Sequence, residues 1–259
     1  MTHGGLVAVV AHPDDEALIA GGTLALAARA GLPTGAVSLT RGELGPISDP
    51  ALATRETLGD VRERELADAG AALGLGWTAC LRVPDGELAW AEHDAVASAL
   101  ASLLAPQRPA ALLTFGDDGL YGHLDHVAAR RMAGLAAELV GKSGLRPLVY
   151  EAAWPVDIIP ALVAAAREAG LPVDLWGVDP AAFGSDGAPA TAVVDVRDVL
   201  GHKLAALRAH RTQLPPEHLL TALPDALAER FLGEEPWRLT GDRSEPDPLN
   251  AMLAGGTVG

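Results

Sequence analysis

Residues 6–16 read LVAVVAHPDDE, and this stretch carries the features that decide the fold and the chemistry. The apolar, β-branched run at 6–10 is too short for a helix and is typical of a fully buried strand. His12 and the three carboxylates at 14–16 follow that run without a spacer. Four ionisable groups at one strand end cost stability unless a cation lies among them. The stretch therefore predicts a divalent metal site, in which His12 and one Asp bind the metal and another Asp is free for proton transfer.

Apolar runs of strand length alternate with segments of helical periodicity along the rest of the chain. This alternation predicts an α/β fold, a Rossmann-like doubly wound, mostly parallel sheet flanked by helices. The expected strands cover 6–11, 35–40, 78–83, 110–115, 147–153 and 191–196, and the expected helices cover 16–30, 52–74, 94–105, 125–140, 157–169 and 198–213. We expect a single domain at residues 1–240, followed by an extended C-terminal tail at 241–259.

The charge balance limits the classes of partner. Acidic residues outnumber basic ones 34 to 19, which gives a formal net charge of −15. Proteins that bind nucleic acid or anionic membrane surfaces depend on clustered Lys and Arg, so we expect neither partner. The single Cys80 fits a reducing compartment, and the chain shows no secretory signal and no bilayer-spanning run. We expect a cytoplasmic protein that acts on a small molecule, and the composition leaves a homo-oligomer open.

A second cluster of histidine and acidic side chains, YGHLDH at 121–126, follows the strand expected at 110–115. Ligands of doubly wound sheets bind outside the carboxyl ends of the strands, so both clusters are expected in one cleft. Catalytic zinc keeps three protein ligands and one open position. His12, one Asp of the first cluster and one His of the second would supply this set and leave an acid–base pair. Two His and one carboxylate also suit Fe²⁺.

Several motifs together resemble the LmbE/PIG-L family of zinc-dependent N-deacetylases. They are AHPDDE at 11–16, LTRGE at 39–43, Arg62-x-x-Glu65-Leu66, Pro84-Asp85-Gly86, Gly122-His123-x-Asp125-His126, and a late segment at 203–213. The resemblance spans residues 6–214 and keeps the motifs in family order. It implies a Zn²⁺-dependent hydrolase that removes the acetyl group from an N-acetylated amino sugar or glycoside.

The resemblance also implies which residues act on the metal and on water. His12, Asp15 and His126 match the metal ligands of the family, and Asp14 matches the general base. An Asp suits that role because a metal lowers the pKa of bound water toward neutrality. Glu16 is expected to support the site or the helix N-terminus, where the helix dipole favours an acidic side chain.

Further positions match residues that act on the substrate in the family. His123 would stabilise the oxyanion and assist departure of the amine, and Asp125 would orient His123. The substrate-binding residues, expected from the resemblance or from positions after strand ends, are Arg41, Glu43, Arg62, Asp85 and Tyr121. His210 lies in the late segment, where a structural contact and a role at the site both remain open.

Other functions compete with this interpretation. A nucleotide-binding oxidoreductase needs a Gly-rich turn after the first strand, whereas the three carboxylates there would repel phosphate. An amidase acting on thiol conjugates and a metal-binding, non-catalytic family member both stay open. Loops at 42–54, 84–94, 116–122 and 154–190 are expected to set specificity, because loops vary most freely.

Overall fold

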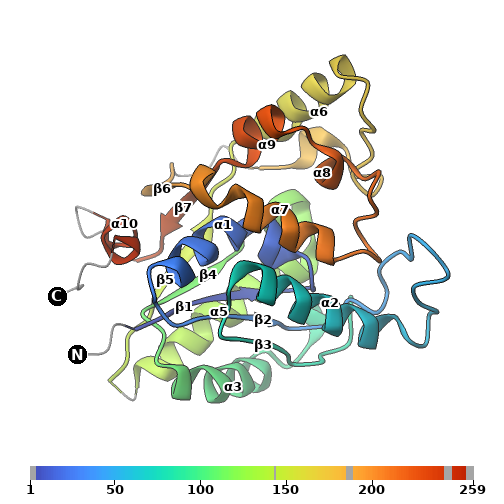
Figure 1. Ribbon diagram of the computed structural model, residues 1–259. Coiled ribbons are helices and arrows are strands. Elements are labelled where there is room, and N and C mark those ends of the chain that lie inside the picture. The colour runs from blue at the N-terminus through green and yellow to red at the C-terminus, as the bar shows by residue number, and fades with distance from the viewer. Residues whose placement is uncertain (1–3, 143, 185–188, 242–246, 255–259) are drawn as a thin grey trace.

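The computed structural model describes residues 4–142, 144–184, 189–241 and 247–254. Within these residues the centre of the molecule is a seven-stranded sheet in the order β3-β2-β1-β4-β5-β7-β6 (Figure 1). The strands are β1 Leu6–Val10, β2 Thr34–Ser38, β3 Trp77–Cys80, β4 Ala111–Thr114, β5 Leu148–Ala152, β6 Ala192–Asp195 and β7 Glu234–Leu239. The first five strands run parallel, and β7 pairs antiparallel with both β5 and β6. The expected doubly wound, mostly parallel sheet is confirmed.

Helices cover both faces of the sheet. They are α1 Asp15–Arg29, α2 Leu58–Leu73, α3 His93–Leu104, α4 Gly119–Gly122, α5 Leu124–Gly141, α6 Ile158–Glu168, α7 Leu200–Ala209, α8 Leu219–Ala222, α9 Asp225–Leu232 and α10 Pro248–Leu253. Figure 1 shows α1, α2 and α7 on one face, and α3 and α5 on the other. None of the described helices combines the length and apolar character needed to cross a membrane.

The topology brings the two histidine clusters together. From β1 the chain turns to β2 and β3 on one side, and it later adds β4 and β5 on the other. The carboxyl ends of neighbouring β1 and β4 therefore form the crevice in which such sheets bind ligands. Every residue of β1 is buried, as its apolar run predicts. The strand thus fixes the following His12 at a rigid edge of the sheet.

Several elements differ from the sequence predictions, among them α8 and α9, which lie beyond the last expected helix. Helix α2 begins at Leu58 rather than at residue 52, because Thr54 and Thr57 hydrogen-bond to one another in a turn before it. Strand β7 was not predicted, since EEPWRL at 234–239 lacks a clean alternation and contains a proline. As a result β6 pairs with β7 rather than continuing the parallel sheet.

The segment expected as an extended tail contains a packed helix. Helix α10 buries Leu249 and Met252, and Asp247 caps its first turn by accepting the Leu249 amide at 2.9 Å. The same carboxylate accepts the hydroxyl groups of Tyr150 and Thr191. The prediction of an extended tail is therefore wrong for 248–253, while 242–246 and 255–259 lie outside the described residues. The single domain at 1–240 stays a prediction.

A buried ion pair fastens β7 to α1 and α7. Lys203 Nζ of α7 donates to Glu235 Oε1 at 2.6 Å, and both side chains are almost completely buried. The two oxygens of Glu235 also accept the amides of Gly22 and Thr23 in the middle of α1. The Thr23 hydroxyl donates to Oε2 and accepts Nε1–H of Trp237. Residues from both ends of the chain thus share one satisfied polar cluster.

Candidate active site

Three side chains of the two clusters converge at the carboxyl ends of β1 and β4. His12, Asp15 and His126 each offer a ligand atom, and these atoms lie within 4.8 Å of one another. His12 Nδ1 lies 3.3 Å from Asp15 Oδ2, and His126 Nε2 lies 3.4 Å from Asp15 Oδ1. The Asp15 carboxylate is thus flanked by one nitrogen of each imidazole.

The hydrogen bonds of His126 leave one of its nitrogens free for a metal. Its Nδ1 donates to the Gly119 carbonyl at 3.0 Å, so the lone pair is on Nε2. That Nε2 is buried and has no hydrogen-bond partner among the described residues. Burial, aided by the positive charge on His12, lowers the pKa of His126 to about 4, so the ring is neutral near pH 7.

The donor set fits a divalent cation. A neutral imidazole lone pair that faces a carboxylate is repulsive unless a cation lies between them. Two imidazoles and one carboxylate are a common ligand set for catalytic zinc, which keeps a further position open. Asp15 also accepts the His12 amide at 2.8 Å, which fixes its orientation. The nearby histidines hold the pKa of Asp15 well below its usual range, despite burial. The residues therefore fit the metal that the sequence predicts.

Asp14 adopts a strained backbone conformation beside this set. Its φ is 120° and its ψ is −31°, a region that residues other than glycine rarely occupy. Arg62 of α2 donates to Asp14 Oδ2 at 3.0 Å and also to the Pro13 and Gly42 carbonyls. Burial raises the pKa of Asp14 to about 6, although Arg62 acts in the opposite direction. Asp14 is thus an oriented carboxyl group that titrates near neutrality.

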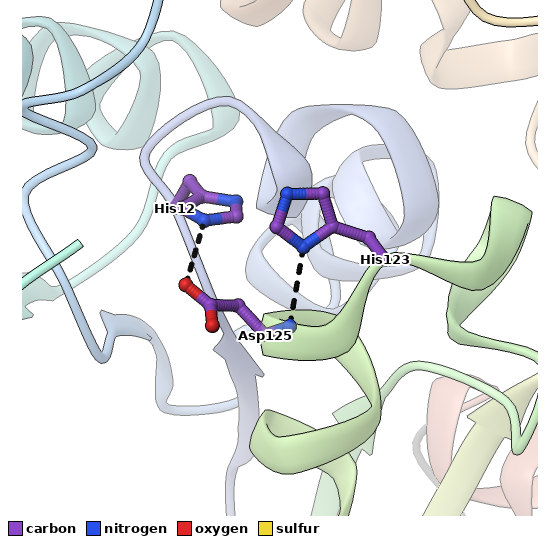
Figure 2. Close-up of side chains that lie close together, drawn as sticks. All are labelled: His12, His123 and Asp125. Atoms are coloured by element: carbon purple, nitrogen blue, oxygen red, sulfur yellow. Dashed lines mark hydrogen bonds and ion pairs between the residues drawn. The ribbon is translucent and has the colours of Figure 1, made fainter. Parts of the chain in front are cut away.

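The Asp125 carboxylate contacts the ring of His12 and not the ring of His123. Figure 2 shows Asp125 at the start of α5, reaching toward the His12 ring, with its backbone amide directed at His123. Asp125 Oδ2 lies 3.5 Å from His12 Nε2 and accepts the Gly86 amide at 2.8 Å. Asp85 Oδ1 approaches the same His12 nitrogen at 3.2 Å. Burial acts to lower the pKa of His12, but hydrogen bonds to Asp125, Asp15 and Asp85 raise it well above its usual value.

His123 is held by a backbone group. Its Nδ1 accepts the Asp125 amide at 3.2 Å, and in this way it caps α5. An accepting Nδ1 carries no proton, so the proton of the neutral ring is on Nε2. Burial and the neighbouring His12 lower the pKa of His123, which favours this neutral form. Asp125 therefore orients His123 through its backbone amide, and not through its carboxylate as the sequence suggested.

A strained turn places Tyr121. Gly119 and Leu120 both have positive φ, and the Leu120 carbonyl accepts the Gly184 amide at 2.8 Å. Such conformations cost about 1–3 kcal/mol at a non-glycine residue and persist where the surroundings enforce them. The Tyr121 ring then lies edge-on to both His123 and His126. The turn thus brings the Tyr121 ring beside His123 and the predicted metal ligand His126.

A cavity of about 270 Å³ opens onto these residues, and both polar and apolar side chains line it. Its polar lining residues include His12, Asp14, Asp15, Arg62, Asp85 and His123. Its apolar lining residues include Leu18, Leu120, Trp176, Leu207, Leu214 and Leu220. A small concave site with a few convergent polar groups is typical of a small-molecule binding site.

Comparisons with known proteins agree with this geometry. A family model described as PIG-L, GlcNAc-PI de-N-acetylase, matches residues 7–137. A 1D-myo-inositol 2-acetamido-2-deoxy-alpha-D-glucopyranoside deacetylase of Thermobispora bispora is 35% identical, over 97% of this chain and 92% of that protein. This chain belongs to the PIG-L family. Another PIG-L relative, the deacetylase of the same description from Tsukamurella paurometabola, is also 35% identical, over 94% of this chain and 95% of its own.

A solved structure supports the fold of this PIG-L protein. A conserved protein from Thermus thermophilus has a TM-score of 0.60 and 27% identity, and the match covers 92% of this chain and 96% of that one. The crevice between β1 and β4 thus belongs to an architecture found in other solved proteins.

Not all substrate-binding residues predicted for this PIG-L chain line the cavity. Arg62, Asp85 and Tyr121 do, whereas Arg41 and Glu43 are not among the lining residues. Arg41 pairs with Asp60 of α2 at 2.6 Å. Glu43 accepts the Asp85 amide at 3.2 Å, so it supports a lining residue instead.

Two polar contacts at the site were not predicted from the sequence. His210, at the end of α7, donates from Nε2 to Glu16 Oε1 at 2.7 Å, and both residues are fully buried. Glu65 accepts the amide and the hydroxyl group of Thr212. The only signal was the occurrence of these residues within the family-like motifs at 11–16, 62–66 and 203–213.

Proposed function

We propose that this chain is a metal-dependent deacetylase that removes the acetyl group from an N-acetylated amino sugar or glycoside. The convergence of His12, Asp15 and His126 beside the oriented carboxyl group of Asp14 carries the proposal. The relatives named as deacetylases of an acetamido sugar linked to inositol support the reaction class and the substrate class.

His12 Nδ1, Asp15 and His126 Nε2 would hold the metal. Zinc is the metal we propose, since two His and one carboxylate are a common catalytic zinc set. When bound, such an ion supplies Lewis acidity, which makes water more acidic and polarises a carbonyl group. Asp85 and Asp125 accept from the opposite nitrogen of His12, which fixes the tautomer that leaves Nδ1 free.

Asp14 is the proposed general base. Arg62 occupies its Oδ2, which leaves Oδ1 to accept the proton of the attacking water. A base that titrates near neutrality can return that proton to the leaving nitrogen in the next step. The products of this reaction are acetate and a free amine.

His123 is the proposed donor to the developing oxyanion. The Asp125 amide occupies its Nδ1, so the proton is on Nε2 and the ring lines the cavity. A positioned donor of this kind stabilises charge that develops only in the transition state. We propose Arg62, Asp85 and Tyr121 as contacts to the sugar, because all three line the same cavity.

The direct test measures acetate release from zinc-loaded protein. The panel contains the inositol-linked acetamido sugar, N-acetylglucosamine, diacetylchitobiose and one thiol-conjugate amide. We expect acetate and free amine in equal amounts from at least one N-acetyl sugar, and none after treatment with a chelator. Cleavage of the thiol-conjugate amide alone would replace the proposal with an amidase. Metal binding without any cleavage would favour a non-catalytic protein.

A further inference from the structure

The strained backbone of Asp14 needs an explanation that its side-chain contacts do not give. Arg62 holds the carboxylate from the α2 side, but it does not contact the Asp14 amide. A φ of 120° at a residue with a side chain persists only when the surroundings enforce it. The group that holds the Asp14 amide therefore decides whether the base keeps this orientation.

Glu16 is that group. Its Oε2 accepts the Asp14 amide at 3.0 Å, two residues back along the chain. Glu16 is completely buried, so its carboxylate has no access to water that could replace a lost partner. Its orientation therefore depends on whichever protein group holds its other oxygen.

His210 occupies that other oxygen. Its Nε2 donates to Glu16 Oε1 at 2.7 Å across a separation of 194 residues. His210 Nδ1 is buried and has no hydrogen-bond partner among the described residues, so Glu16 is its polar anchor. The neighbouring Thr212 is fastened separately, to Glu65 of α2.

We propose that His210 is a positioning residue that acts through Glu16 to hold Asp14 in the conformation required for proton transfer. This inference rests on the proposed deacetylase function. The link His210–Glu16–Asp14 holds the backbone amide of the base, and Arg62 holds its carboxylate and the preceding Pro13 carbonyl. His210 therefore affects the rate of the chemical step without touching substrate or metal.

The test compares two substitutions in the same buried segment. His210→Leu introduces an apolar side chain of similar reach and removes the donor to Glu16. We expect kcat to fall about 10–100-fold, as for a displaced catalytic group, with KM within about twofold and an unchanged zinc content. Thr212→Val removes the buried hydroxyl bond to Glu65 and is expected to lower stability while kcat stays within about twofold. His210→Gln restores a donor and is expected to recover much of kcat.

Two further measurements separate positioning from a structural role. In the Asp14→Asn background, His210→Leu should cause no further loss of kcat, because residues that act as a unit are not additive. Glu16→Gln cannot accept hydrogen bonds from both the Asp14 amide and His210, so its kcat should match that of His210→Leu. This variant replaces His210→Leu in the test if His210→Leu does not fold. An unchanged kcat in His210→Leu, or an equal loss in Thr212→Val, would overturn the inference.

A crystal structure of zinc-loaded His210→Leu decides the inference without turnover. We expect Asp14 to leave the positive-φ region when Glu16 loses its anchor. Retention of a φ near that of the wild type would overturn the positioning role. Absence of acetate release by the wild type would instead contradict the proposed function, so the two failures are distinguishable.

Discussion

Asp125 Oδ2 lies 3.5 Å from Nε2 of His12, so a residue of the second histidine cluster supports a predicted metal ligand of the first. The same carboxylate accepts the Gly86 amide, which fixes it in place. A carboxylate behind a metal-binding imidazole sets the tautomer and raises the basicity of the ligand. The two clusters therefore meet through this contact as well as through the metal that we propose they share.

Asp125→Asn should weaken zinc binding. The substitution removes a charged acceptor from His12, and loss of such a partner costs about 10–100-fold in metal affinity. Competition with a chromophoric chelator measures the change. His123→Ala is the matched variant from the same turn and should retain the wild-type affinity while kcat falls. Equal affinities in wild type and Asp125→Asn would contradict the support of His12 by Asp125.

Asp14→Asn should abolish most turnover and retain the metal. Asn keeps the shape of the side chain but cannot accept a proton, and loss of a general base costs about 10²–10⁴-fold in kcat. Acetate release gives the rate, and elemental analysis gives the zinc content. Turnover close to the wild-type value would exclude Asp14 as the base.

Removal of the metal should reversibly abolish activity and lower the melting temperature. An ion that binds only the folded chain stabilises it, and saturation well above Kd corresponds to a shift on the order of 10 °C for a domain of this size. Calorimetry before and after chelation, and after the return of Zn²⁺, measures the shift. His126→Ala should melt at the same temperature with and without zinc. A chelator-resistant activity would contradict metal dependence.

The stability of the protein should fall between about pH 6.5 and pH 4 because of His218. Burial lowers the pKa of His218 to about 4 in the folded chain, whereas the unfolded chain keeps the ordinary value. The unfolded state therefore binds more protons in this window, and the free energy of unfolding decreases as pH falls. Allowing for the partial exposure of the ring, the contribution of His218 is about 2 kcal/mol.

Urea unfolding across that range, compared with His218→Asn, measures the effect. The His218 ring caps α8 by accepting the Leu220 amide at 3.3 Å, and Asn is also a good N-cap residue. The variant should lose less stability than the wild type as the pH is lowered. Parallel pH profiles for the two proteins would show that His218 does not titrate as expected.

Lys203→Met should destabilise the fold strongly and leave the chemistry of the folded fraction intact. The substitution leaves Glu235 buried without its cation, and breaking such a pair costs about 3–5 kcal/mol. Arg197→Met is the control, because Arg197 pairs with Glu234 of the same strand as Glu235 at the surface, where an exposed ion pair contributes little to stability. Chemical denaturation compares the two variants. Similar losses of stability would contradict a structural role for the buried pair.

The periodicity of the sequence was sufficient to predict the first βα unit. The strand expected at 6–11 and the helix expected at 16–30 correspond to β1 and α1 within one residue at each end. A buried strand and a buried helix both have strong apolar patterns, so local sequence specifies them. Strand β7 could not be predicted, because its residues fit the sheet only through neighbours that are distant in the chain.

In the site, too, the sequence predicted what local motifs specify and missed contacts between residues that are distant in the chain. Residue types and strand ends predicted that His12, one Asp of the first cluster and one His of the second would meet. The family resemblance implied Asp15 and His126 as those two residues, and the structure brings the three side chains together. Asp125 contacts His123 through its backbone amide, whereas its carboxylate contacts His12. The sequence did not indicate this, because side-chain direction at a helix start depends on what packs opposite it. The contact between Glu16 and His210 joins residues 194 positions apart, and a single sequence does not indicate such a pair.

The buried cluster around Glu235 has a consequence for how the chain is made. Gly22 and Glu235 lie 213 residues apart, so the hydrogen bonds that fasten α1 to β7 cannot form on a ribosome until Glu235 has emerged. Strand β6 likewise waits for β7, which lies between it and β5. Contacts of such long range slow folding and leave sheet edges exposed in the meantime. Every nascent chain therefore carries Asp15 at the start of a helix, three residues after His12, before β7 can secure that helix.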